Sequence, residues 1–565
     1  MAPQSDPSTR HEPPFVGDPS FIEPLINPMS SLVTHPDLSH AEGRGGLPAT
    51  VDPSRTGDEN ERHFRTGHLS DDLRRRSVRG GTVTLAAQAA RFALTLGSTA
   101  VLARLLRPED FGLLGMVMAV TGFVALFKDL GLSMATVQRD EISHEQVSTL
   151  FWINVALSLL TLLVAAALAP AIAWFYNEPQ LVGITLALCI GFLFSGLAVQ
   201  HQALLRRQMR LTALAAISVL AMAVGIATAI VAALLGAGYW ALVLQHLAMA
   251  ATDAASLWFF CDWRPGLPRR HSGVRSMLFF GGNLTGFNVV NYFARNLDNV
   301  LIGWCWGPQA VAFYAKSYSL LLLPINQVNA PLSGVVIPAL SRLQNDPERY
   351  RAYYKHAIGL TVAVGMPIVA FLFAAADSIV LTILGDQWLE TVPIFRALAP
   401  AAFVGTFNVA TGWVFVSLGQ TDRQFRFGSF AAVVTVGAFF VGLPWEAVGV
   451  AWACSIAMCA LRLPGLWYCF RKSPLRTTDV WAAIAPVAVA SCAAATIVLA
   501  ANPVVAPHLG PPGKLFAGLI LFGVAYVGCL GVLPGGRRVI RQVLTLVHEL
   551  RMPSRTRAKP TRESG

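Results

Sequence analysis

A row of polar side chains interrupts an otherwise apolar stretch of the sequence near its middle. The row consists of Asn288, Asn291, Arg295 and Asp298. Their spacing of three, four and three residues places them on one face of a helix. Arginine carries a planar fork of donors that suits phosphate, and amide side chains can bond to hydroxyl groups. The row therefore predicts a surface that binds an anionic, hydroxyl-bearing ligand.

The same face recurs 200 residues earlier in the chain. The corresponding positions are Gln88, Arg91, Thr95 and Ser98, and all of them are polar. A charge near the centre of a bilayer costs about 2.5–3.5 kcal/mol on the insertion scale, and this cost falls beside a water-filled cavity. We therefore expect Arg91 and Arg295 to line one shared cationic cavity.

Structural roles for these residues remain open alternatives. Polar side chains also join helices to one another in membranes. Arg295 and Asp298 could form an ion pair at i and i+3. Asp298 could instead bind a coupling proton or sodium ion.

The apolar segment that follows, 311–337, contributes further candidates. Lys316 and Asn326 would add a cation and an amide to the cavity. Lys316 could equally reach the outer membrane interface, because it lies near the end of the segment. Pro324, Pro331 and Pro338 predict kinks in this helix.

Composition indicates a membrane protein. The 565 residues are 54% hydrophobic and 13% charged, with a mean hydropathy of +0.52, whereas soluble domains carry about 25% charged residues. The sequence predicts fourteen apolar spans of the length that a bilayer requires. They are 82–104, 111–131, 150–170, 181–203, 212–235, 239–261, 276–304, 311–337, 357–376, 393–417, 427–444, 446–469, 480–501 and 514–533.

The formal charge of +11 lies mostly in the connections between spans. Eighteen arginines and lysines fall within the even-numbered connections or at their edges, while the odd-numbered ones hold only Arg104, Arg107 and Lys514. Positive residues mark the cytoplasmic side, so both termini are expected there. Trp263 and Trp388 are among the aromatic residues near span ends that would form an interfacial belt.

Residues 1–80 are rich in Pro, Ser, Asp and Arg, and they predict a disordered cytoplasmic tail. Residues 536–565 predict a basic cytoplasmic tail. The eight cysteines form no Cys-x-x-Cys pair, so neither a metal site nor a disulfide framework is expected. No nucleic-acid motif accompanies the positive charge.

Similar segments follow the first and seventh spans, and they divide the chain. Residues 102–114 read LARLLRPEDFGLL, and residues 302–314 read IGWCWGPQAVAFY. We expect an all-α polytopic protein with an N-lobe at 81–275, a C-lobe at 276–470 and two extra spans at 471–535. Parallel repeats of this kind pack about an axis along the membrane normal, with the substrate site between them.

The chain resembles the Wzx-like oligosaccharide flippases of the polysaccharide transporter branch of the multidrug/oligosaccharidyl-lipid/polysaccharide exporter superfamily. The resemblance covers about 80–535, and the long segment 1–80 departs from the family's pattern. It rests on several segments in the expected order, among them LARLLRPEDFGLLGMV (102–117), ALFKDLGLSMATVQR (125–139), NYFARNLDNVLIG (291–303) and GWVFVSLGQTDRQFRFG (412–428).

The resemblance implies a transporter of the bacterial inner membrane and not an enzyme. Such proteins flip polyprenyl-pyrophosphate-linked oligosaccharides, and arginines of the first and seventh helices would meet the pyrophosphate. This role falls on Arg91 and Arg295. Membrane lipids are expected partners, and the polymerase and export machinery for the polysaccharide are candidate partners.

Other functions fit the sequence less well. A drug exporter for cations should carry carboxylates rather than arginines in its cavity, and a glycan polymerase or ligase should carry a large outer loop with catalytic Arg or His. A non-transporting component of an assembly complex would leave the two matching polar rows unexplained. No cofactor is expected, because GPPGK (510–514) lacks the first glycine and the Ser or Thr of a nucleotide-binding loop.

Overall fold

A computed structural model describes residues 73–128, 131–139, 142–268, 275–505 and 509–551. Most of the expected N-terminal tail and the end of the C-terminal tail lie outside these residues. All regular secondary structure within them is helical. The longer helices are α3 (Leu73–Leu105), α4 (Pro108–Ala125), α6 (His144–Tyr176), α7 (Gln180–Arg207), α8 (Leu211–Leu234), α9 (Tyr239–Phe260), α10 (Arg275–Arg342), α11 (Pro347–Ala374), α13 (Thr391–Gly405), α15 (Thr421–Gly442), α16 (Glu446–Ala460), α18 (Thr477–Val505), α19 (Pro511–Val532) and α20 (Gly536–Arg551). The shorter ones are α5 (Leu132–Gln138), α12 (Ala376–Ile383), η3 (Asp386–Trp388), α14 (Val409–Ser417), η4 (Leu443–Trp445) and α17 (Arg462–Phe470).

Ten helical segments in the described chain are long and apolar enough to cross a membrane, and eleven if the bent pair in α10 counts as one span. The fourteen predicted spans stay a prediction for three reasons. Helix α9 is not among the ten, α10 runs through both 276–304 and 311–337, and Thr421–Phe470 passes as one segment. The turn η4 interrupts that last segment at the predicted boundary between two spans.

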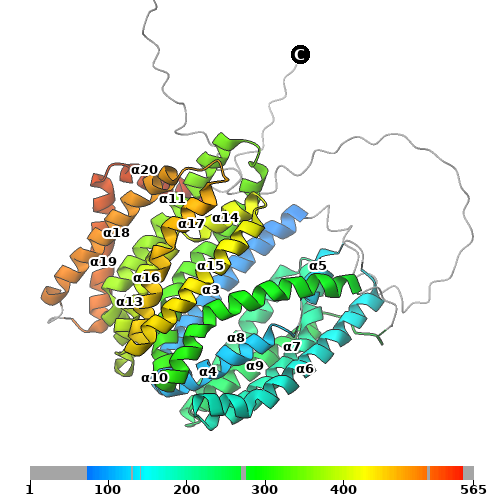
Figure 1. Ribbon diagram of the computed structural model, residues 1–565. Helices are drawn as coiled ribbons and strands as arrows, with labels where there is room; N and C mark the ends of the chain where they lie inside the picture. Colours follow the sequence, from blue (N-terminus) through cyan, green and yellow to red (C-terminus); the bar gives the residue numbers. More distant parts are fainter. Residues whose placement is uncertain (1–72, 129–130, 140–141, 269–274, 506–508, 552–565) are drawn as a thin grey trace, which may run out of the picture.

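Figure 1 shows two groups of helices with α3 and α10 running between them. Helices α6 to α9 gather on one side, and α11 to α19 gather on the other. The packing contacts agree, because α6 packs on α7 and α8 on α9, whereas α11 packs on α18 and α18 on α19.

Helix α10 consists of two arms that meet at Gly307. This residue has φ 79° and ψ −175°, a conformation that glycine adopts without steric cost. Pro308 then starts the second arm, just as Pro108 starts α4 after the end of α3. The second arm bends by 42° between Asn329 and Pro331, which confirms the kink predicted from Pro331.

Helix α4 packs closely along both arms of α10. Tyr292 on the first arm donates its hydroxyl to the carbonyl oxygens of Ala119 (2.9 Å) and Met118 (3.1 Å). A Cβ atom built on Gly112 would overlap the backbone of Pro308. Glycine is therefore required at position 112 for this approach.

One end of the bundle, which we call the Gly307 end, joins the early helices to the late ones. Arg104 near the end of α3 donates to the carbonyl of Thr382 at 2.6 Å. Gln387 donates to the carbonyls of Ala103 and Leu106, and Trp388 Nε1 donates to Ala103 at 2.9 Å. These contacts fasten the 382–388 segment to the turn between α3 and α4.

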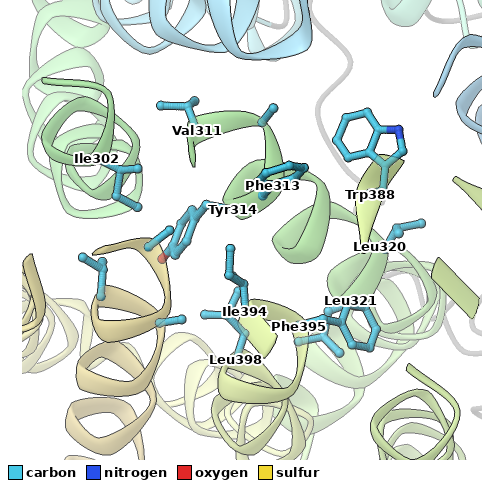
Figure 2. Close-up of a cluster of buried hydrophobic side chains, with 14 of the residues drawn as sticks. Ile302, Val311, Phe313, Tyr314, Leu320, Leu321, Trp388, Ile394, Phe395 and Leu398 are labelled. Atoms are coloured by element: carbon cyan, nitrogen blue, oxygen red, sulfur yellow. The ribbon is translucent and has the colours of Figure 1, made fainter. Parts of the chain in front are cut away.

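Trp388 is fully buried in a large apolar cluster at the Gly307 end. Figure 2 shows it beside Phe313 and near Leu320, with Tyr314, Ile394 and Phe395 in the same cluster. Trp263, at the opposite end of the molecule, is also fully buried. The expectation that both belong to an interfacial aromatic belt is wrong, because each indole N–H bonds to another part of the chain, Ala103 and His144 respectively.

The opposite end, which we call the Arg342 end, ties the late helices to one another. Arg351 on α11 contacts Asp479 at the start of α18 through two nitrogens, at 2.9 and 3.1 Å, and Lys355 Nζ lies 3.7 Å away. Only 10% of the Asp479 side chain is exposed. This ion-pair group anchors α18 to α11.

We expect Asp479→Asn to lower the free energy of unfolding by about 2 kcal/mol, because charge-assisted hydrogen bonds contribute about 1.5–3 kcal/mol each. The thermal unfolding midpoint of the detergent-purified protein measures this as a drop of a few degrees. Asp346→Asn is the matched control. It removes an exposed ion pair with Arg349 but keeps a side chain that caps α11, so its effect should stay within about 0.5 kcal/mol. Equal midpoints for the two variants would contradict the anchoring role of Asp479.

Candidate functional site

Helix α3 carries the first polar row. Thr95 and Ser98 donate to the carbonyls of Arg91 (2.8 Å) and Thr95 (3.1 Å) in their own helix. Gln88 instead donates to Gln327 Oε1 on the second arm of α10, at 2.6 Å. Arg91 is exposed, and within the described chain no hydrogen bond or ion pair reaches its guanidinium. Of the four residues, only Gln88 and Arg91 present polar groups away from their own helix.

The first arm of α10 carries the second row. Asn288 and Asn291 are helical in the backbone, and their side chains lie outside the described part. Arg295 is exposed, and it forms no hydrogen bond or ion pair with any described residue. Arg91 and Arg295 are thus two exposed guanidinium groups, each on a helix that lies between the two helix groups (Figure 1).

Asp298 has a different environment from Arg295. Its side chain is only 5% exposed. One carboxylate oxygen accepts a hydrogen bond from the Tyr314 hydroxyl at 2.9 Å, and the other accepts from the backbone N–H of Asn299 at 2.8 Å. The structure contains no ion pair between Asp298 and Arg295, so the open alternative of an i,i+3 pair is wrong for this conformation.

The separation of Arg295 and Asp298 follows from helix geometry. Residues three apart differ in direction by about 60° around the helix axis. That angle suffices to direct the Asp298 side chain into the interface with the second arm, where Tyr314 lies. The Arg295 side chain stays outside this interface. A buried carboxylate without a cationic partner is costly unless hydrogen bonds stabilise it, and Tyr314 and Asn299 supply these bonds.

The second arm of α10 holds the remaining candidates. Lys316 Nζ lies 4.1 Å from the centre of the Phe111 ring on α4, a cation–π contact near the Gly307 end. Asn326 is exposed, and Gln327 next to it accepts the bond from Gln88. Lys316 therefore lies toward the Gly307 end of the arm, about ten residues from the pair formed by Gln88 and Gln327.

Two partners of the site were not among the residues for which the sequence predicted a binding role. Tyr314 binds Asp298 from 16 residues away, and Gln327 binds Gln88 from 239 residues away. Both are polar residues of the apolar segment 311–337, and the sequence marks them by that contrast alone. Among the described residues, no group of three or more His, Cys, Asp or Glu could hold a metal ion.

The fold is that of helical membrane transporters. The solved structure titled "Lipid II flippase MurJ, inward closed conformation" matches with a TM-score of 0.64 over 84% of this chain and 100% of that chain, at 13% identity. An inward-facing multidrug resistance MATE transporter of the MOP superfamily matches with a TM-score of 0.55, over 69% of this chain and 97% of that chain, at 17% identity. These matches show a shared fold.

The protein belongs to the family described as polysaccharide biosynthesis protein, whose model matches residues 101–393, more than half of the chain. It is 24% identical to the lipopolysaccharide biosynthesis protein WzxC of Escherichia coli K12, over 66% of this chain and 76% of that protein. It is also 24% identical to the teichuronic acid biosynthesis protein TuaB of Bacillus subtilis 168, over 63% and 77%. The succinoglycan biosynthesis transport protein ExoT of Rhizobium meliloti is 25% identical, over 62% and 71%.

Family, fold and apolar helices together establish a multi-pass membrane protein of polysaccharide biosynthesis. The resemblance drawn from the sequence is confirmed.

Proposed function

We propose that this protein flips a polyprenyl-pyrophosphate-linked oligosaccharide across the bacterial inner membrane by alternating access. The observation that carries the proposal is the pair of exposed guanidinium groups, Arg91 and Arg295, in a chain of a polysaccharide biosynthesis family. Pyrophosphate is a dense anion with acceptor oxygens in the geometry that arginine binds with two parallel hydrogen bonds. The protein moves its substrate and does not act on it as an enzyme.

In the proposed site, Arg91 and Arg295 bind the pyrophosphate from two helices. Lys316 meets the same group once it approaches the Gly307 end. Gln88, Asn326, Asn288 and Asn291 bond to sugar hydroxyls. The polyprenyl chain remains among the lipid tails throughout.

The proposed architecture has fourteen spans, in an N-lobe (81–275), a C-lobe (276–470) and two additional helices (471–535). The basic connections support a cytoplasmic location for both termini and for the Arg342 end. The Gly307 end then faces the periplasm. The contacts of Arg104, Gln387 and Trp388 at that end favour a conformation closed to the outside.

Export by alternating access requires these contacts to break. Substrate bound between the helix groups must stabilise the outward conformation more than the inward one, since a ligand shifts an equilibrium only by its differential affinity. The hydrogen bond between Gln88 and Gln327 spans α3 and α10 on the side of the polar rows. A sugar hydroxyl that replaces this bond would supply such a differential interaction.

The experiment that tests the function uses a strain that lacks its own flippase and makes the cognate lipid-linked oligosaccharide. We expect wild-type protein to restore the surface polymer and to reduce the lipid-linked precursor in the inner membrane. The flippase proposal would be overturned if the protein reached normal membrane abundance, restored no polymer and left the precursor level as it is in the strain without the protein. Restored polymer with an unchanged precursor level would instead favour a role in assembly machinery.

Asp298 is the proposed site of a coupling proton or sodium ion. Asp298→Asn keeps the size of the side chain but removes its charge, so we expect export that no longer responds to collapse of the ion gradient. Tyr314→Phe is the matched control, because it removes the 2.9 Å hydrogen bond and leaves the carboxylate; its export should still respond to the gradient. The measurement is precursor export with and without a protonophore or a sodium ionophore. A gradient response that persists in Asp298→Asn would assign the carboxylate a structural role.

A further inference from the structure

The last helix of the described residues, α20, lies in the segment for which the sequence predicted only a basic tail. Helix α20 has the sequence GRRVIRQVLTLVHELR, in which apolar residues recur every three or four positions. Arginines occupy positions 537, 538 and 541 in the first two turns of the helix. This periodicity gives one apolar face and one cationic face.

The position of α20 matches the level where neighbouring helices change from charged to apolar sequence. A Cβ atom built on Gly359 of α11 would lie 3.7 Å from Gln542, and one built on Gly535 would lie 3.5 Å from Pro486 of α18. In α11, Lys355 is the last charged residue before Gly359, with His356 next to it. In α18, Asp479 is the last charged residue before Pro486. The first half of helix α20 therefore lies about one to two turns past the last charged residues of both helices, near the level of a membrane interface.

The apolar side chains of α20 that the structure describes differ in how far protein covers them. Val539 is 8% exposed and packs into the core cluster around α11, whereas Leu544 is 62% exposed. An exposed leucine at the level of the interface can insert among lipid tails. The helix thus packs against the protein on one edge and leaves another edge uncovered.

The cationic face has no anionic partner in the described chain. Arg537, Arg538 and Arg541 are exposed, and none forms an ion pair there; Arg537 Nε donates only to the carbonyl of Gly531, at 2.9 Å. Three guanidinium groups beside an uncovered apolar edge complement the phosphates of anionic lipids.

We infer that α20 is a binding site for anionic phospholipid headgroups in the leaflet at the Arg342 end. Its three arginines contact lipid phosphates while Leu544 inserts below them. The occupant is lipid rather than a protein partner, because the uncovered edge lies at the level of the bilayer and carries both cationic and apolar groups. This inference requires only a membrane location and does not depend on the transported substrate.

The test measures hydrogen exchange of residues 536–551 in the full-length protein, in nanodiscs of phosphatidylcholine with or without phosphatidylglycerol. We expect exchange in α20 to slow at least fivefold with phosphatidylglycerol at low salt, and to slow less at 0.5 M salt because salt screens exposed charges. The variant Arg537→Gln, Arg538→Gln, Arg541→Gln should lose the response to phosphatidylglycerol.

The matched control is Arg471→Gln, Lys472→Gln, Arg476→Gln, which removes three exposed charges at the same end of the molecule. It should retain the response in α20. Equal protection in both lipid compositions would overturn the inference and leave the cationic face for a protein partner. Retention of the response in the α20 variant would also overturn it.

Discussion

Replacing Arg91 and Arg295 together by alanine is expected to abolish export and to leave the protein at normal abundance in the membrane. Within the described chain neither guanidinium has a hydrogen bond or an ion pair, so folding does not depend on them. A charge-assisted hydrogen bond contributes about 1.5–3 kcal/mol, and each 1.4 kcal/mol is a factor of ten in affinity. Loss of one arginine should therefore weaken pyrophosphate binding by about 10- to 100-fold.

The measurement is precursor export in the flippase-deficient strain, with each single variant, the double variant and the lysine replacements. Lysine keeps the charge but loses the planar fork, so Arg295→Lys should export more than Arg295→Ala and less than wild type. Arg426→Ala is the matched control, since it removes an exposed arginine of α15 outside both polar rows. Wild-type export by the double variant would eliminate the assigned anion site.

Replacing Trp388 by alanine is expected to open the Gly307 end. The indole is fully buried, donates to Ala103, and packs edge-to-face on Phe111 at 5.3 Å and on Phe313 at 5.9 Å. Truncating a buried tryptophan to alanine costs about 3–5 kcal/mol. Because Trp388 joins the early helices to the late ones, much of this loss falls on the closed conformation.

A cysteine introduced at Leu106, which is 4% exposed in this conformation, reports the opening. In purified protein that lacks the exposed Cys305 and Cys492, we expect maleimide to react with this cysteine at least ten times faster when Trp388→Ala is present. Trp388→Phe keeps a ring but loses the N–H group. The rate of maleimide reaction in this variant should fall between the rates measured with Trp388 and with Trp388→Ala. Trp481→Ala, at the other end of the molecule, serves as control. An unchanged rate in a folded Trp388→Ala protein would show that other contacts hold this end closed.

The sequence predicted the features that depend on local pattern. Apolar length predicted the helices, Pro331 predicted a bend, and the match between Arg107-Pro108 and Gly307-Pro308 located two helix breaks. These features follow from solvent preference and backbone geometry within a few residues, so no knowledge of tertiary contacts is needed.

The partners of polar groups depend on contacts between distant segments, and they were harder to predict. The spacing of Arg295 and Asp298 permitted an ion pair, but the break at Gly307 brings Tyr314 to Asp298 instead. Trp388 is an aromatic residue near the end of an apolar span, as interfacial residues are. It is nevertheless buried, because the 382–388 segment folds onto the end of α3. The helical form of residues 536–551 was also missed, because their positive charge was considered without their periodicity.

The contact between Gly112 and Pro308 has a mechanical consequence. Two backbones meet there without a side chain between them. An interface made of flexible side chains can yield gradually as rotamers change, whereas rigid surfaces at contact distance can either touch or part. We therefore expect α4 and α10 to adopt two discrete relative arrangements. The Gly307 end would then pass between closed and open without a stable half-open intermediate.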